Sequence, residues 1–164
     1  MNWWANHVDH TVEYAQAAKK KDRIATLKAM LGLITGVAQW AGLLQPKLGD
    51  VNSILAHGLM AEHVIAAKLM SDRSPLEDNL GVGVALQLLA RNADMQANFY
   101  GAAVDGFPAH DFRKLLGGHL EATANYIKDL TAGDDASFDG HVAAARKNAM
   151  EIDQFTAKAL LKPA

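Results

Sequence analysis

Apolar residues recur at intervals of three and four along most of this chain, the spacing that places them on one face of an α-helix. Six stretches show the pattern, and turn residues separate them. The stretches that we expect to be helical cover residues of about 4–20, 23–44, 51–72, 75–100, 108–131 and 137–161. No segment shows a sustained alternation of apolar and polar residues. The pattern therefore predicts an all-α protein.

The predicted helices form three pairs that repeat along the sequence. Three histidines and three aspartates recur at one constant interval: His7, His63 and His119, and Asp22, Asp78 and Asp134. A repeat of this length is typical of bundled or stacked helical units. We therefore predict one domain over residues 1–164, an up-and-down bundle of three helical hairpins at about 4–44, 51–100 and 108–161. The aspartates fall at the turn inside each hairpin, where we expect them to cap the second helix.

Turn residues also mark the predicted helix ends. Ser74-Pro75-Leu76-Glu77 has the form of a capping box with proline at the first helical position, so it predicts a helix start. Pro46, Gly49 and Asp50 predict the end of one helix and the cap of the next. Thr131-Ala132-Gly133-Asp134 predicts another boundary of the same kind.

The segment from Ala29 to Pro46 runs 18 residues without a charge, close to the length of a membrane span. A helix that is apolar on all sides lies in a protein core or in a membrane. The polar and glycine residues within this segment favour a buried helix, and we expect no membrane span. The Gly32/Gly36 spacing predicts close contact with a neighbouring helix.

Composition narrows the functional classes. The formal net charge is −2. A nucleic-acid-binding protein usually has an excess of basic residues, so we do not expect this chain to bind nucleic acid. The chain has no cysteine, which excludes disulfides, thiolate zinc sites and iron–sulfur clusters. The residues after Trp3 and Trp4 are polar rather than apolar, so no secretory signal is predicted and we expect a cytoplasmic protein. Trp3 is expected to be exposed, whereas Trp4 and Trp40 are expected to pack in the core.

The repeated histidines lie on or beside the apolar stripe of each first helix. A histidine in such a stripe is either a neutral core residue with hydrogen-bonded nitrogens or a metal ligand. If the hairpins surround a common axis, His7, His63 and His119 converge on one ion; if they pack side by side, the rings stay about 8–10 Å apart. Both arrangements are compatible with the sequence.

Other polar residues extend the candidate site. Asn92 and Asn148 could orient a histidine ring, and Tyr126 lies two helical turns after His119. Together with His63 and His119 they form the predicted ligand-binding set. The His7-x2-His10-x2-Glu13 spacing resembles a metal site, although His10 and Glu13 also fit an exposed pair on one helix. For most of the other polar residues on these helices, a group that includes His57, Asp94, Asn98 and Asp153, a solvated face is the simpler interpretation.

No established catalytic motif of helical bundles occurs here. Glu-x-x-His and His-Glu-x-x-His are both absent from the sequence.

Residues 59–161 resemble a group of small bacterial all-helical proteins. The matching stretches are Leu59-Met60-Ala61-Glu62-His63, residues 91–98, Leu115-Leu116-Gly117-Gly118-His119 and Asn148-Ala149. Met60 stands where that group has tryptophan. The resemblance implies a helical bundle and singles out His63, Asp94, His119 and Asn148, but it implies no reaction. The first hairpin would then be an added copy of the third.

Three functional hypotheses follow. The first is a binding protein whose core-facing histidines hold a divalent metal ion or a small apolar ligand. The second is a metal-dependent enzyme in which Glu62, Glu121 or Asp94 acts as a general base. The third is an interaction or scaffold protein without a small-molecule site. A homodimer is compatible with all three.

Overall fold

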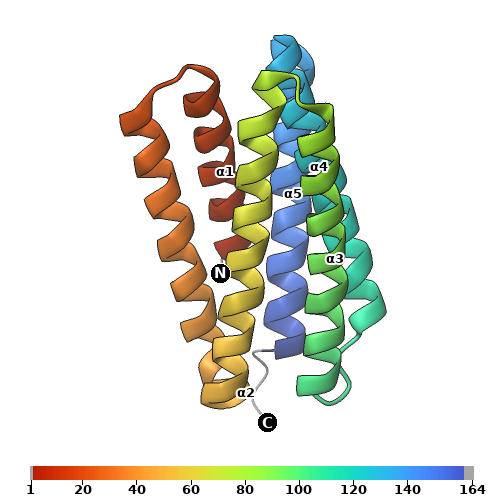
Figure 1. The fold of residues 1–164 in the computed structure, drawn as a ribbon. Coiled ribbons are helices and arrows are strands. Elements are labelled where there is room, and N and C mark those ends of the chain that lie inside the picture. Colours follow the sequence, from red (N-terminus) through yellow and green to blue (C-terminus); the bar gives the residue numbers. More distant parts are fainter. Residues whose placement is uncertain (1, 161–164) are drawn as a thin grey trace.

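The computed structural model describes residues 2–160, and every regular element in that range is helical. The elements are α1 (Trp3–Lys19), α2 (Arg23–Arg73), the short 3-10 helix η1 (Ser74–Leu76), α3 (Asn79–Ala103), α4 (Ala109–Ala132) and α5 (Asp135–Leu160) (Figure 1). The prediction of an all-α protein is confirmed.

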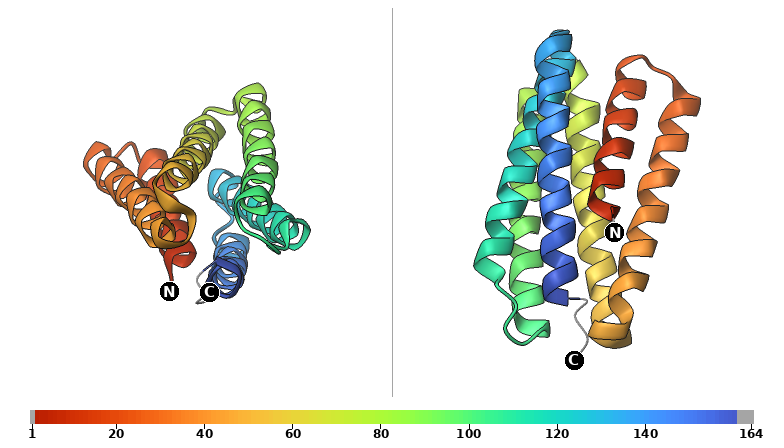
Figure 2. Two further views of the ribbon diagram at one scale, coloured as in Figure 1. Left: turned by 90° about the horizontal axis from the view of Figure 1, so that it is seen from below. Right: turned by 180° about the vertical axis from the view of Figure 1, so that it is seen from behind.

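Element α2 consists of two helical segments that run in opposite directions and meet at Gly49. It spans 51 residues, and Gly49 has non-helical backbone angles, with φ 73° and ψ 174°. Figures 1 and 2 show residues 23–48, the first limb, running alongside residues 50–73, the second limb, in the opposite direction. The described range therefore has five α-helices, and the prediction of six separate helices is not confirmed. Pro46 lies inside the first limb instead of ending it.

The repeated aspartates cap helices, as predicted. Asp22 accepts hydrogen bonds from the backbone N–H groups of Ile24 and Ala25 at the start of α2. Asp78 accepts one from Gly81 in α3, and Asp134 accepts one from Ser137 in α5. Each carboxylate pairs an N–H group that the first helical turn leaves without a partner. Gly133, at φ 76°, ends α4 in the left-handed conformation, also as predicted.

The predicted capping box at Ser74 is wrong. Ser74 has helical backbone angles, φ −58° and ψ −47°, whereas an N-cap residue is extended. Its hydroxyl pairs with that of Thr131 instead of a backbone N–H. The chain forms η1 here, turns at Glu77 with φ 55°, and begins α3 at Asn79 under the cap of Asp78.

The helices pack into an elongated bundle (Figure 2). Helix α1 contacts α2 and α5, and α2–α3, α3–α4 and α4–α5 are neighbouring pairs. Helices far apart in the sequence, such as α1 and α5, therefore lie side by side and close the bundle. Large side chains fill the interior between them, among which the most deeply buried are Trp4, Trp40, Tyr100, Tyr126 and Phe112.

The first limb of α2 buries only one of its faces. Ala29, Leu33 and Val37 are buried, but Leu27 is 61% and Leu31 55% exposed. The prediction of a helix buried on all sides is therefore wrong. By length and composition alone, the stretch from Arg23 to Leu76 is apolar enough to cross a membrane, a test that core helices and signal sequences also pass.

The glycines of the first limb do make the predicted close contact, and the contact is with α1. A Cβ atom at Gly32 would lie 2.8 Å from the ring of His10. A Cβ atom at Gly36 would lie 3.5 Å from Nε1 of Trp3. Because glycine has no side chain, the first limb can lie close to α1 at His10 and Trp3.

Candidate metal centre

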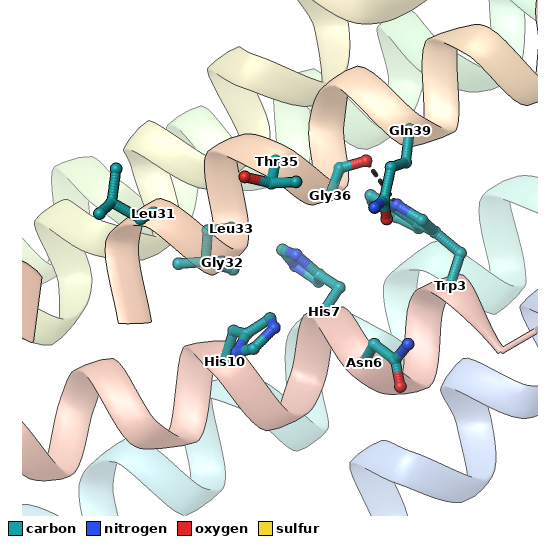
Figure 3. Close-up of a pocket in the computed structure, with 10 residues that line it drawn as sticks. All are labelled: Trp3, Asn6, His7, His10, Leu31, Gly32, Leu33, Thr35, Gly36 and Gln39. Atoms are coloured by element: carbon teal, nitrogen blue, oxygen red, sulfur yellow. Dashed lines mark hydrogen bonds between the residues drawn. The ribbon is translucent and has the colours of Figure 1, made fainter. Parts of the chain in front are cut away.

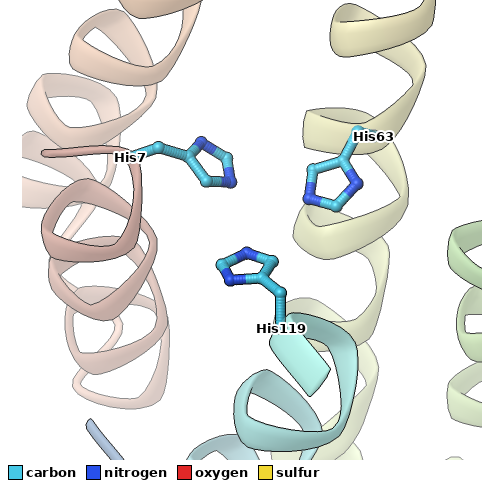
Figure 4. A group of neighbouring side chains, drawn as sticks. All are labelled: His7, His63 and His119. Carbon is cyan, nitrogen blue, oxygen red and sulfur yellow. The ribbon is translucent and has the colours of Figure 1, made fainter. Parts of the chain in front are cut away.

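The three repeated histidines converge in the interior of the bundle. His7 comes from α1, His63 from the second limb of α2, and His119 from α4 (Figure 4). Each ring offers a nitrogen that lies within 4.8 Å of the nitrogens offered by the other two. The ring centroids are 5.4, 5.9 and 6.0 Å apart. Of the two arrangements open to the sequence, the structure has the convergent one.

Burial keeps these rings neutral. His7 is 5% exposed, and His63 and His119 are 2% exposed. Desolvation is the main reason that the pKa of His7 lies well below 6.5, with neighbouring His63 and His119 adding to the effect. It also lowers the pKa of His63 to about 4 and that of His119 to about 3. At pH 7 each ring therefore has one nitrogen lone pair available to a ligand.

Two of the ring nitrogens are buried without a hydrogen-bond partner among residues 2–160. They are Nδ1 of His63 and Nδ1 of His119. Buried polar atoms in folded proteins are nearly always paired, and each unpaired one costs roughly 1–3 kcal/mol. Three neutral imidazoles whose nitrogens approach one another this closely form a donor set that suits zinc, copper, iron or nickel.

Asn92 and Asn148 lie behind two of the histidines. Asn92 Nδ2 donates to the carbonyl oxygen of Leu59 at 2.8 Å, and Asn148 Nδ2 donates to that of Leu115 at 3.1 Å. The donor and the acceptor of the second bond follow those of the first at the same interval that separates His63 from His119. Asn92 raises the pKa of His63 and Asn148 that of His119, against the larger effect of desolvation. Both asparagines therefore lie near a histidine ring, and the hydrogen bonds that they donate go to backbone carbonyls.

Gln96 extends this polar layer on α3. Its Nε2 donates to Asn92 Oδ1 at 2.7 Å, and it is 1% exposed. The sequence pattern did not single it out. Its position four residues after Asn92, on the same face of α3, is the signal that could have identified it.

Tryptophans border the cluster on one side. Trp4 meets all three imidazoles edge to face, with ring centroids 5.4–6.0 Å apart. Trp3 stacks on His7 and donates its Nε1–H to the carbonyl oxygen of Gly36. Trp3 is only 6% exposed, so the expectation of an exposed Trp3 is wrong. The indole has a polar partner inside the bundle, which removes the cost of burying its N–H.

Asp153 is a further buried polar residue near this end of α1. It is 3% exposed, and its Oδ1 accepts a hydrogen bond from the Trp4 backbone N–H at 3.2 Å. Burial raises the pKa of its carboxyl, and the hydrogen bonds from the α1 backbone oppose that shift. Asp153 is therefore an exception to the solvated face expected for most residues of its group. Its place beside Ile152 on the buried stripe of α5 was the available signal.

The remaining candidate residues do not join the histidines. Tyr126 is fully buried and packs against Phe138. Asp94 forms an ion pair with Arg113 at 2.7 Å, and Glu121 is exposed. Glu62 approaches Asn92 at 3.4 Å.

His10 and Glu13 form the exposed pair that their spacing allowed. His10 Nδ1 and Glu13 Oε2 are 3.0 Å apart. Within residues 2–160, the one group of histidine and acidic side chains with metal-site geometry contains the three histidines and no carboxylate.

Comparison with known proteins identifies no relative of this chain. The chain matches no protein-family model, no curated protein and no solved structure. A function can therefore be inferred only from the geometry of the site.

Proposed function

We propose that this protein binds a divalent transition-metal ion through His7, His63 and His119. The observation that supports the proposal is the mutual approach of three buried, neutral imidazole nitrogens to within 4.8 Å. Each histidine comes from a different part of the chain, so their convergence is not a by-product of spacing along one helix.

Zinc fits the donor set best. Zinc accepts imidazole nitrogens at roughly 2.0–2.1 Å and takes three protein ligands with one open position in its catalytic sites. Three nitrogens around a tetrahedral ion lie roughly 3.3 Å apart at that bond length. The nitrogens, now up to 4.8 Å apart, would approach to this value on binding zinc. Three neutral ligands also leave the ion with its full charge, which favours a fourth ligand.

We further propose that the chain is built from three copies of one helical hairpin, with one ligand from each. The caps at Asp22, Asp78 and Asp134 support this, because they recur at equal intervals and each begins the second helix of a hairpin. The Asn92–Leu59 and Asn148–Leu115 bonds support it as well. On this view α2 contains the second helix of the first copy and the first helix of the next.

Elemental analysis of untagged protein tests the metal proposal. We expect close to one zinc ion per chain after equilibration with zinc and gel filtration. His63→Ala and His119→Ala should lose it. His10→Ala should keep it, because His10 lies in the exposed pair with Glu13.

Chelation provides a readout that does not depend on the variants folding. Treatment of the wild-type protein with EDTA should lower its melting temperature. Substoichiometric metal in the wild type together with an unchanged melting temperature would overturn the proposal. The histidines would then be polar core residues.

A further inference from the structure

A cavity of about 270 Å³ lies between α1 and the first limb of α2, directly beside His7 (Figure 3). It extends from His7, which is buried, to Leu31, which is 55% exposed. His7 is the member of the histidine cluster that lines it, whereas His63 and His119 do not. His7 is therefore the residue that the cavity and the histidine cluster share.

The cavity lies where the first hairpin differs from the other two. Gly36, Asn92 and Asn148 occupy equivalent positions of the repeat, because the interval between them equals that between the three histidines. In the later hairpins the asparagine side chain bonds to a backbone carbonyl four residues before the histidine. At the first site there is no side chain.

The hydrogen bond at the first site also runs the opposite way. Trp3, four residues before His7, donates its side-chain N–H to the backbone carbonyl of Gly36. The same pair of positions is thus connected in all three hairpins. At the first site, however, the residue is a glycine that lines the cavity, and the Trp3 indole lies 3.5 Å from where its Cβ would be.

Charge indicates what the cavity accepts. Its lining, drawn from the described part of the chain, contains no aspartate or glutamate, whereas Asn6, Thr35 and Gln39 bring neutral polar groups to it. A divalent ion held by three neutral imidazoles retains a charge of about +2 in a buried position, which is costly unless a negative charge accompanies it. An anion entering beside His7 would supply that charge.

We propose that the cavity admits a small anion, of the size of azide or acetate, which becomes the fourth ligand of the metal ion held by His7, His63 and His119. This inference rests on the proposed metal function. The volume of about 270 Å³ lies just under the range of roughly 300–1,000 Å³ typical of pockets for drug-sized molecules, so the occupant has few atoms.

Cobalt-substituted protein tests the inference, because the visible spectrum of Co(II) reports its ligands. Apoprotein is loaded with one equivalent of Co(II) and titrated with azide. We expect a saturable change in the d–d bands of the wild type. Gly36→Asn, which restores the residue of the other two hairpins, should retain the Co(II) spectrum and bind azide at least tenfold more weakly.

Gly42→Asn is the matched control. It introduces the same side chain on the same limb at an exposed glycine with no other atom within 4 Å of the added Cβ. Its azide response should equal that of the wild type. If Gly36→Asn does not fold, Gly32→Leu fills the other part of the cavity by displacing the ring of His10.

The two proposals fail in different ways. If Co(II) gives no bound spectrum in the wild type, the metal function itself is wrong. If Co(II) binds but azide leaves the spectrum unchanged, the anion site is overturned. An azide response as strong in a folded, cavity-filled variant as in the wild type would also overturn it.

Discussion

The histidine cluster is costly to the protein that contains it. His63 and His119 are each 2% exposed, and each has a ring nitrogen without a hydrogen-bond partner among the described residues. A packed apolar side chain of similar size would avoid the resulting penalty of roughly 1–3 kcal/mol for each nitrogen. Asn92 and Asn148 add further buried polar groups behind the rings. Such an arrangement is understandable if a ligand offsets its cost.

Acid should destabilise the metal-free protein. Unfolded histidines take up protons near pH 6.5, whereas burial holds the pKa of His63 at about 4 and that of His119 at about 3. Protons therefore favour the unfolded chain as pH falls below 6.5. The free energy of unfolding should decrease by up to about 1.4 kcal/mol per pH unit for each buried histidine. Urea denaturation in EDTA between pH 7 and 5 measures this slope.

Two variants identify the source of the slope. His119→Gln removes one of the three buried rings and should reduce the slope by about a third. His110→Gln removes an exposed ring from the same helix and should leave the slope unchanged. A stability that is flat between pH 7 and 5 in the wild type would contradict the burial of three neutral histidines.

At the scale of elements, Gly49 determines the path of the chain. Its φ of 73° and ψ of 174° belong to a region of backbone space that is essentially restricted to glycine. The residue separates the first limb from the second, and hence the helix that covers His7 from the helix that contains His63. A Cβ at this position would meet no other atom within 4 Å, so the constraint is purely conformational.

Gly49→Ala should therefore destabilise the protein by about 1–3 kcal/mol through backbone strain alone. Gly58→Ala is the control, because Gly58 is exposed and helical and also has open space around its Cβ position. That substitution should raise stability by up to about 1 kcal/mol, since alanine favours helix over glycine. Thermal unfolding followed by circular dichroism compares the two. Equal effects would refute the role assigned to Gly49.

Local signals in the sequence predicted some element boundaries and misplaced others. Asp22 and Gly133 could be recognised because their roles depend on nearby backbone groups only. Ser74 could not, because its hydroxyl partner, Thr131, is distant in the sequence and belongs to another helix. The same limit applies to Trp3, whose burial depends on the carbonyl of Gly36.

For the whole molecule, the convergence of the histidines could not be deduced from their spacing. The repeat placed each ring on an inward face, but a side-by-side packing of hairpins would have kept them apart. Contact of α1 with α5, the first and last helices described, closes the bundle and brings His7 to the others. The cavity beside Gly36 could not be predicted either, because its lining residues come from two helices whose packing the sequence does not specify.

Binding of zinc should stabilise the three helices that contain the histidines together. Free zinc at 100 times its Kd should raise the free energy of unfolding by about 2.7 kcal/mol, and at 1,000 times by about 4.1 kcal/mol. Hydrogen exchange should slow together in α1, in the second limb of α2 and in α4, because each contains one histidine of the proposed site. His119→Gln should show little of this gain. Protection confined to one helix would argue against a shared ion.

The sequence separation of the three histidines has a consequence for biosynthesis. His7 lies in the first helix and His119 in α4, so the third ring leaves the ribosome long after the first. A nascent chain that has completed α1 and α2 can bring only two of the rings together. The full cluster forms after α4 has emerged and docked against the earlier helices. Metal loading at this site would therefore distinguish chains that include α4 from chains that end before it.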